Sequence, residues 1–216
     1  MAAKSSTRRK AASPAWVVLK FGGTSVSSVE RWETIAALLR QRQAEGLRPV
    51  VVHSALATVS NKLDELLHRA LEMDVTAQVA GIRELHLRLA AGLQVDGEKE
   101  LGGYFRELEQ LLAGIHLIRE VSPRIQARVM GLGELMATRL GAAYLARVGL
   151  KVTWLDAREL LRSNMPPGTN ERSAWLAANC DFDPDAELQA RFAAEAGVVL
   201  TQGFIASNAR GDGVLL

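Results

Sequence analysis

Short apolar strands alternate with amphipathic helices along most of this 216-residue chain, and this alternation constrains the fold more than any other feature. Apolar runs predict buried strands at residues 16–20, 48–55, 151–156 and 198–207. Helical periodicity occupies the segments between them. The sequence therefore predicts an α/β fold, in which a mostly parallel sheet has helices on both faces. Ligands of such sheets bind at the carboxyl ends of the strands.

One region departs from this alternation. Residues 75–120 contain two helical patterns and no strand pattern, which predicts a helical lobe inserted between the α/β units. Ser122 followed by Pro123 predicts the start of the next helix, because a hydroxyl cap precedes proline at the first helical position. That helix crosses three glycines, each costing about 1 kcal/mol relative to alanine. It is either one weakened helix or two helices that meet near Gly133.

Capping residues predict where the other helices begin. Ser60 or Asn61 would cap the helix after the second strand. Asp156 would cap a short helix after the third strand. Asp183, with Pro184 in the first helical position, would start the last helix.

Composition is that of a soluble globular protein with one domain or at most two, since 48% of residues are hydrophobic and 23% charged. Residues 1–14 are basic and lack an apolar segment, so they are not a secretory signal. They are interpreted as a disordered, solubilising tail, with an organelle transit peptide as the alternative. No apolar run reaches the length that spans a bilayer. We expect a cytoplasmic enzyme that does not bind membranes.

Charge and cysteine content exclude other classes of function. The net charge is +2, but the excess lies in the tail, and the rest of the chain has 22 basic against 24 acidic residues. A nucleic-acid-binding protein carries its basic residues on the folded domain, so nucleic-acid binding is not expected. The single Cys180 cannot form an internal disulfide. Because there is no cluster of Cys and His, no metal site is predicted.

The stretch VLKFGGTSV, residues 18–26, places a lysine and two glycines at the end of the first predicted strand. Glycines let backbone N–H groups approach an anion, and a following helix N-terminus favours negative charge. Lys20 precedes Gly22 and Gly23, whereas a Walker A loop has its lysine after the glycines. From these residues alone, a phosphate-binding loop and a tight turn beside a surface lysine are equally good interpretations.

Glu134 lies between glycine and apolar residues within a helical pattern. An unpaired buried carboxylate is costly, so this residue is either a solvated charge on the polar face of its helix or a receptor for a ligand ammonium group. His53, at a strand end, is either an acid or base or a histidine held by local hydrogen bonds.

Five motifs, in order along the chain, resemble aspartate kinases of the amino-acid kinase fold. They are KFGGTSV, VVVHSA, GELM, WLDAREL and TQGFIAS, and they run from Val17 to Ser207. The helical lobe resembles the long class of these enzymes. The resemblance implies transfer of the ATP γ-phosphoryl group to the side-chain carboxylate of L-aspartate, giving 4-phospho-L-aspartate. It also implies Mg²⁺ held mainly by the nucleotide and a homo-oligomeric full-length enzyme.

The resemblance also assigns site residues. Lys20 would bridge phosphoryl oxygens in the transition state as the catalytic residue. Ser60 stands where the family often has threonine. The residues implied to bind ATP are Lys20, Phe21, Gly22, Gly23 and Ser54, and those implied to bind aspartate are Ser60, Glu134 and Phe204.

One departure from the family pattern limits these expectations. After TQGFI, aspartate kinases continue with a glycine-rich segment that carries an arginine, a serine and an aspartate of the active site, but this sequence ends at Leu216. We expect residues 15–216 to be the N-terminal part of a catalytic domain that is inactive alone. The alternatives are a catalytically silent half-domain that acts in binding, or a kinase of sister specificity for glutamate or N-acetylglutamate.

Overall fold

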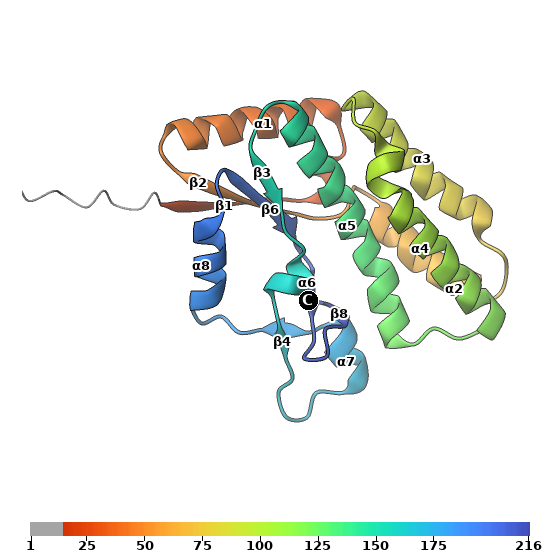
Figure 1. Cartoon of the computed structure of the whole chain (residues 1–216). Helices are drawn as coiled ribbons and strands as arrows, with labels where there is room; N and C mark the ends of the chain where they lie inside the picture. The colour runs from red at the N-terminus through yellow and green to blue at the C-terminus, as the bar shows by residue number, and fades with distance from the viewer. Residues whose placement is uncertain (1–14) are drawn as a thin grey trace, which may run out of the picture.

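The computed structural model describes residues 15–216, and its centre is a parallel sheet of four strands (Figure 1). Across the sheet the order is β1 (Trp16–Phe21), β2 (Arg48–His53), β6 (Val198–Gln202) and β3 (Val152–Trp154), and every neighbouring pair is parallel. The α/β prediction is confirmed. The prediction of a disordered tail at residues 1–14 lies outside the described residues.

Helices cover both faces of this sheet. Val51 and Leu200 belong to the main core, which includes buried residues of α1 (Val29–Ala44) and α5 (Pro123–Arg147). On the opposite face, Val50 and Val199 pack in a small cluster with Phe192 of α8 (Ala186–Ala194). The inner strands β2 and β6 are therefore the buried ones, as their apolar sequences predict.

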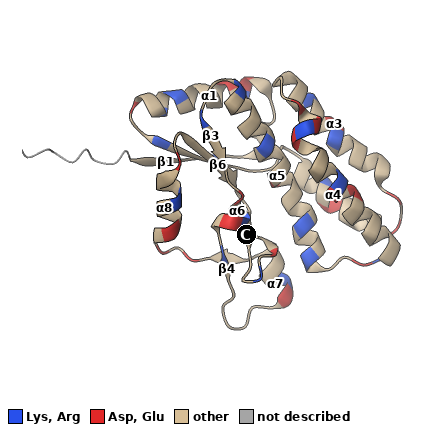
Figure 2. Ribbon diagram, viewed as in Figure 1, with Lys and Arg blue, Asp and Glu red and all other residues tan. Residues whose placement is uncertain are grey.

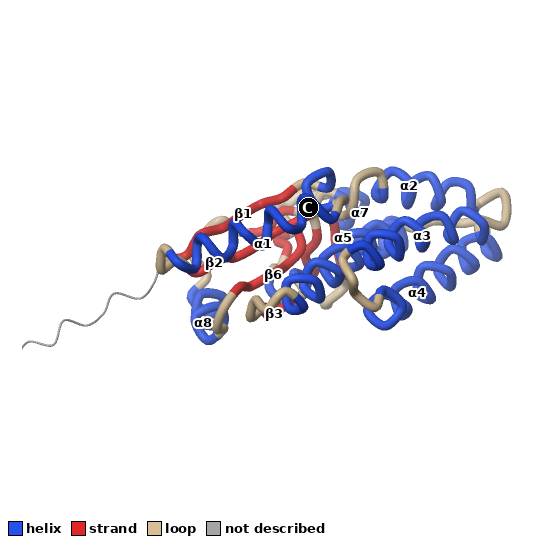
Figure 3. Tube along the Cα trace, turned by 90° about the horizontal axis from the view of Figure 1, so that it is seen from above, coloured by secondary structure: helices blue, strands red, loops and turns tan. Residues whose placement is uncertain are grey.

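The helical lobe lies at one end of the sheet (Figure 3). It contains α2 (Val59–Ala70), α3 (Thr76–Gly92) and α4 (Gly97–Ile118), which pack together and against α5. Fully buried leucines and Phe105 fill the space between these helices. Residues 75–120 form α3 and α4 and contain no strand, as their helical patterns predict.

The long helix α5 is continuous across its glycines. Ser122 accepts a hydrogen bond from the Ile125 N–H and Pro123 follows it, as predicted. The glycines allow close approach of other elements. A Cβ on Gly141 would lie 2.3 Å from the Trp32 ring, and one on Gly133 would lie 3.1 Å from the Ala55 Cβ.

We expect Gly141→Ala to lower the free energy of unfolding by about 1–3 kcal/mol, because overpacking against the buried Trp32 outweighs the better helix propensity of alanine. Denaturant titration would measure this change. The matched control is Gly114→Ala in α4, where an added Cβ meets nothing within 4 Å, and this variant should be slightly more stable. A stable Gly141→Ala protein would contradict this role for the glycine.

Four local predictions are wrong. β1 is an edge strand on which Trp16, Val18 and Lys20 are exposed, so it is not a buried strand. Helix α2 begins after Thr58, which has a φ of 70° and makes no side-chain cap hydrogen bond, and Ser60 lies in the first turn of the helix. Thr58 therefore occupies the cap position instead of Ser60 or Asn61. The helix begins at Val59, which is buried.

The other two errors concern the C-terminal third. Asp185, rather than Asp183, caps α8 by accepting a hydrogen bond from the Leu188 N–H. The predicted strand at residues 198–207 is broken after β6, because Phe204 has a φ of 66°. The chain then forms the antiparallel hairpin of β7 (Ile205–Ser207) and β8 (Gly213–Leu215).

Smaller elements complete the described chain. Asp156 caps α6 (Ala157–Leu160) as predicted, by accepting a hydrogen bond from the Arg158 N–H. Arg210, Gly211 and Asp212 lie in the turn between β7 and β8. The remaining elements are the 3-10 helix η1 (Gly23–Val26), α7 (Glu171–Leu176) and the antiparallel pair β4 (Ser163–Asn164) and β5 (Asn179–Cys180).

Charged residues of both signs are interspersed over the helices (Figure 2). Within residues 15–216, no helix combines the length and the apolar character needed to cross a bilayer.

Candidate functional site at the carboxyl ends of the strands

Three parallel strands end side by side at one edge of the sheet. Phe21, the last residue of β1, pairs with His53 at the end of β2, and His53 pairs with Gln202 at the end of β6. The loops that follow these strands are therefore neighbours, as expected for the ligand-binding edge of a parallel sheet. Backbone hydrogen bonds join them, from the Ser54 N–H to the Phe21 carbonyl (3.2 Å) and from the Gly203 N–H to the His53 carbonyl (3.1 Å).

The glycine loop after β1 packs directly on the loop after β2. A Cβ on Gly23 would lie 2.7 Å from the Ala55 carbonyl oxygen, so only glycine fits at this position. Ser27 links the two loops, because its hydroxyl donates to the Gly23 carbonyl (2.6 Å) and accepts from the Ala57 N–H (2.8 Å). Gly22 has open space around it. The two glycines thus differ: Gly23 allows close packing, and Gly22 leaves its backbone accessible.

Lys20 presents its ammonium group on the less covered face of the sheet. Its side chain is exposed, and its register partners across the sheet are Val52 and then Thr201. Among the described residues no hydrogen bond or ion pair engages this ammonium. Phe21 is half-buried and packs against the main core. Lys20 is therefore accessible to an anion, whereas Phe21 could contact an anion only through its backbone.

Glu134 is buried, with 2% of its surface exposed, so it is not a solvated charge. The Ala55 backbone N–H donates a hydrogen bond to its carboxylate, and Gly133 allows α5 to approach this loop closely. Within residues 15–216, the second carboxylate oxygen, Oε2, has no hydrogen-bond partner. Burial raises the pKa of Glu134 to about 7, and the Ala55 hydrogen bond only partly offsets this shift. A buried carboxylate with one free oxygen is well suited to accept a cation.

Phe204 is held in a backbone conformation that is uncommon for a residue other than glycine. Its φ is 66°, and its side chain is 39% exposed. The Ile205 N–H donates to the Gly203 carbonyl (2.8 Å), and the Leu216 N–H donates to the Phe204 carbonyl (2.9 Å). These bonds fix the tight turn and project an aromatic ring at the carboxyl end of β6. Outliers of this kind are concentrated at binding sites.

The remaining residues predicted from the sequence lie at the same edge of the sheet. Ser54 directly follows β2 and is half-buried, and Ser60 lies in the first turn of α2 with partial exposure. Of the eight residues implied by the family resemblance, Lys20 and Phe21 end β1, and Ser60 and Glu134 lie on α2 and α5. The others, Gly22, Gly23, Ser54 and Phe204, lie in the segments that follow the strands.

His53 is not an accessible acid or base. It is fully buried, with its ring centroid 5.3 Å from that of Trp32, and its Nδ1 lies 2.9 Å from the Ser54 carbonyl. Burial lowers its pKa to about 4. The interpretation of a locally held histidine is the one that agrees with the structure.

A buried polar network behind the site was not predicted. Gln202 accepts a hydrogen bond from the Ala157 N–H (2.7 Å) and donates one to the Thr138 hydroxyl (2.8 Å). Thr138 also accepts from the Trp154 indole (3.0 Å) and lies 2.9 Å from the Glu134 carbonyl. The network ties the end of β6 to the turn of α5 that carries Glu134. The only signal in the sequence is a glutamine within an apolar strand.

Nearly the whole chain is similar to known proteins. The profile of the Amino acid kinase family matches residues 15–215. The chain belongs to the amino acid kinase family. Among curated relatives of this family member, aspartokinase 2, chloroplastic, of Arabidopsis thaliana is 40% identical over 151 residues, which cover 66% of this chain and 27% of the relative. A bifunctional aspartokinase/homoserine dehydrogenase 1, chloroplastic, of the same plant is 30% identical over 203 residues, covering 89% of this chain and 21% of the relative.

Solved structures agree with this placement. Aspartokinase III of E. coli, in complex with aspartate and ADP, superposes with a TM-score of 0.75 at 27% identity, over 94% of this chain and 43% of that protein. The same enzyme in complex with lysine and aspartate gives a TM-score of 0.70 at 25% identity. The chain thus spans less than half the length of this solved relative and about a quarter of the length of the curated ones.

In the described part of the chain, no group of three or more His, Cys, Asp or Glu side chains is arranged to hold a metal ion.

Proposed function

We propose that this protein contributes the phosphate loop and much of the amino-acid pocket of an aspartate kinase. The enzyme transfers the ATP γ-phosphoryl group to the side-chain carboxylate of L-aspartate. The observation that carries the proposal is Glu134, a buried carboxylate with one free oxygen beside the strand-end loops. Relatives named aspartokinase, and a similar solved structure bound to aspartate and ADP, support the choice of substrates.

The chemistry requires positioning and neutralisation of charge. An oxygen of the aspartate side chain attacks the γ-phosphorus, and the bond between this phosphorus and the leaving oxygen of ADP breaks. Lys20 would neutralise charge on the phosphoryl oxygens, and the accessible backbone at Gly22 would donate a hydrogen bond to them. Ser54 would contact the nucleotide. Mg²⁺ would be held mainly by the nucleotide phosphates and would neutralise part of their charge.

The amino-acid substrate would bind on the other side of the loops. Glu134 would accept its ammonium group, Ser60 would donate to its carboxylate, and the Phe204 ring would line the pocket. A free ammonium is the best partner for Glu134, because an acetylated amine carries no charge. This favours aspartate or glutamate over N-acetylglutamate.

The test compares the 216-residue chain with a chimera in which the C-terminal remainder of E. coli aspartokinase III continues after Leu216. We expect the chimera to phosphorylate aspartate in preference to glutamate and N-acetylglutamate. We expect the 216-residue chain alone to be inactive. Preference for glutamate would assign the sister specificity. A folded chimera that transfers no phosphoryl group to any of the three acids would favour the binding role.

Glu134 should make substrate binding depend on pH. Its pKa of about 7 means that the carboxylate is increasingly protonated below neutrality and cannot then pair with the ammonium of aspartate. We expect the KM for aspartate in the chimera to rise as pH falls below 7, approaching tenfold per pH unit. Kinetics between pH 5.5 and 8.5 would measure this rise. The same rise in a Glu134→Gln chimera would assign the titration to another group.

We further propose a homo-oligomeric full-length enzyme in the cytoplasm. Light scattering of the chimera tests the first part. The plant relatives carry chloroplastic names, so the second part is tested by comparing the location of fluorescent fusions with and without residues 1–14.

A further inference from the structure

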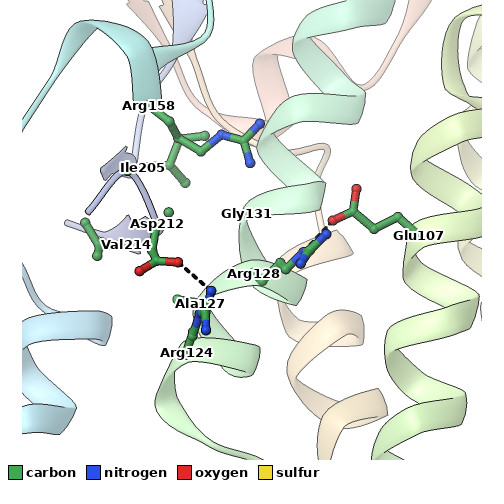
Figure 4. Close-up of a pocket in the computed structure, with 11 residues that line it drawn as sticks. Glu107, Arg124, Ala127, Arg128, Gly131, Arg158, Ile205, Asp212 and Val214 are labelled. Atoms are coloured by element: carbon green, nitrogen blue, oxygen red, sulfur yellow. Dashed lines mark hydrogen bonds and ion pairs between the residues drawn. The ribbon is translucent and has the colours of Figure 1, made fainter. Parts of the chain in front are cut away.

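A charged cavity adjoins the candidate site without sharing its residues (Figure 4). It has a volume of about 360 Å³ and lies between α4, the N-terminal half of α5, Arg158 and the β7–β8 hairpin. None of the eight predicted site residues lines it. Its charged lining residues are Arg124, Arg128, Arg158, Glu107 and Asp212.

Three guanidinium groups from two helices line this cavity. Arg124 pairs with Asp212 of the hairpin (2.6 Å), and Arg128 pairs with Glu107 of α4 (2.6 Å). Arg158 forms a bidentate arrangement with Asp156. A guanidinium has five N–H donors. The pairs made by Arg124 and Arg128 each use one nitrogen, so most of their donors remain available to a ligand.

The position of these arginines on α5 is unfavourable for the helix itself. The N-terminus of a helix is positive and prefers acidic side chains. The 25-residue α5 has no acid in its first turn, and Arg124 is there instead, with Arg128 one turn later. The helix end and the arginines therefore raise the positive potential of the same cavity. A bound anion would relieve this arrangement.

The carboxylates that pair with Arg124 and Arg128 can be exchanged at low cost. The side chains of Arg124 and Arg128 are 64% and 56% exposed, and ion pairs of this exposure contribute little to stability. Asp212 is only 20% exposed, but it also pairs with Arg210, so it keeps a cationic partner when a ligand oxyanion takes its place on Arg124.

We propose that this cavity binds a small oxyanion with two or more negative charges, a phosphate-bearing or polycarboxylate molecule. Its floor adjoins the candidate site, because Gly131 lies one turn before Glu134 on α5 and faces Ile205, the neighbour of Phe204. The proposal does not depend on kinase activity.

The test is isothermal titration of the 216-residue chain with pyrophosphate and with citrate, at an ionic strength fixed with KCl. Pyrophosphate represents a phosphate-bearing ligand and citrate a polycarboxylate ligand, so the two titrations show which class the cavity prefers. We expect Arg124→Gln and Arg128→Gln each to weaken binding by about tenfold or more, because each removes charge-assisted hydrogen bonds. We expect Glu107→Gln to strengthen binding, since it removes a competing carboxylate.

Two controls make the result decisive. Arg88→Gln changes a 72% exposed arginine of α3 that also pairs with a glutamate, and it should leave binding unchanged. Lys20→Ala is the second control, and it reports whether either ligand binds at the strand-end loops instead. Binding that is lost with Lys20→Ala but kept with Arg128→Gln would overturn the proposal, as would the absence of binding by both ligands. Circular dichroism would confirm that each exposed-site variant is folded.

Discussion

Replacing Lys20 by alanine should lower kcat in the chimera by about two to three orders of magnitude, comparable to the loss of one preorganised charge partner in a transition state. Lys20 is exposed at the end of β1, and among residues 15–216 no other group engages its ammonium. Its replacement should therefore change the free energy of unfolding by less than about 0.5 kcal/mol. Steady-state kinetics and denaturant titration of the same samples would measure both effects.

Lys99→Ala is the matched control, because Lys99 is also exposed but lies in α4 of the helical lobe. It should leave kcat unchanged. Lys20→Arg keeps the charge but alters its shape and reach, so it should recover only part of the lost rate. If Lys20→Ala turns over within threefold of the parent chimera, Lys20 does not act on the phosphoryl group.

The part of the fold that could be predicted is the part in which local pattern and burial agree. β2 and β6 read as apolar runs because helices cover both of their faces. The helical lobe could be recognised because α3 and α4 carry leucines at helical spacing and bury them against each other. The same reasoning failed for β1, since nothing in WVVLKF reveals that the strand lies at the edge of the sheet.

The errors within the site have a common physical origin. Thr58 and Phe204 have positive φ angles that neither residue type favours, so their own propensities point away from the observed structure. At both positions backbone hydrogen bonds from the neighbouring turns decide the conformation, as when the Leu216 N–H bonds to the Phe204 carbonyl. These hydrogen bonds either join residues that are distant in sequence or form only once the whole turn has folded. No periodic pattern records them.

The alternatives for Glu134 could be resolved only by packing. Seven residues on either side are helical and mostly apolar whether or not the carboxylate faces water. The structure decides because Gly133 lets α5 contact Ala55 and Val59, which covers the carboxylate and supplies its hydrogen bond from the Ala55 N–H. Burial in turn produces the raised pKa that makes the residue a candidate receptor.

Glu134→Gln should have opposite effects on catalysis and on stability. Loss of the buried carboxylate removes the partner of the substrate ammonium, which should cost about 2–5 kcal/mol in transition-state binding. This corresponds to a fall in kcat/KM for aspartate of at least about thirtyfold. Most of the fall should appear as a higher KM, because the ammonium is bound equally in the ground state and the transition state.

Stability should change in the other direction. The pKa of Glu134 is raised in the folded chain, from an ordinary value near 4.5 to about 7. A raised carboxyl pKa means that the stability associated with its protonated form is fully present below pH 4.5 and is lost as pH rises through 7. Glutamine has no charge to bury, so Glu134→Gln should be more stable than the parent at pH 8, by up to about 3 kcal/mol. At pH 4 the two proteins should be nearly equal.

Denaturant titrations of the ligand-free 216-residue chain at pH 4 and pH 8 would measure this difference. Glu100→Gln is the comparison variant, because Glu100 of α4 is paired with Arg139 of α5. This variant should be less stable than the parent protein, since it loses an ion pair. A variant at Glu134 that loses stability at pH 8 would mean that the carboxylate is held for structural reasons. Gain of stability together with loss of aspartate binding is the pattern expected of a residue that the fold keeps buried for its ligand.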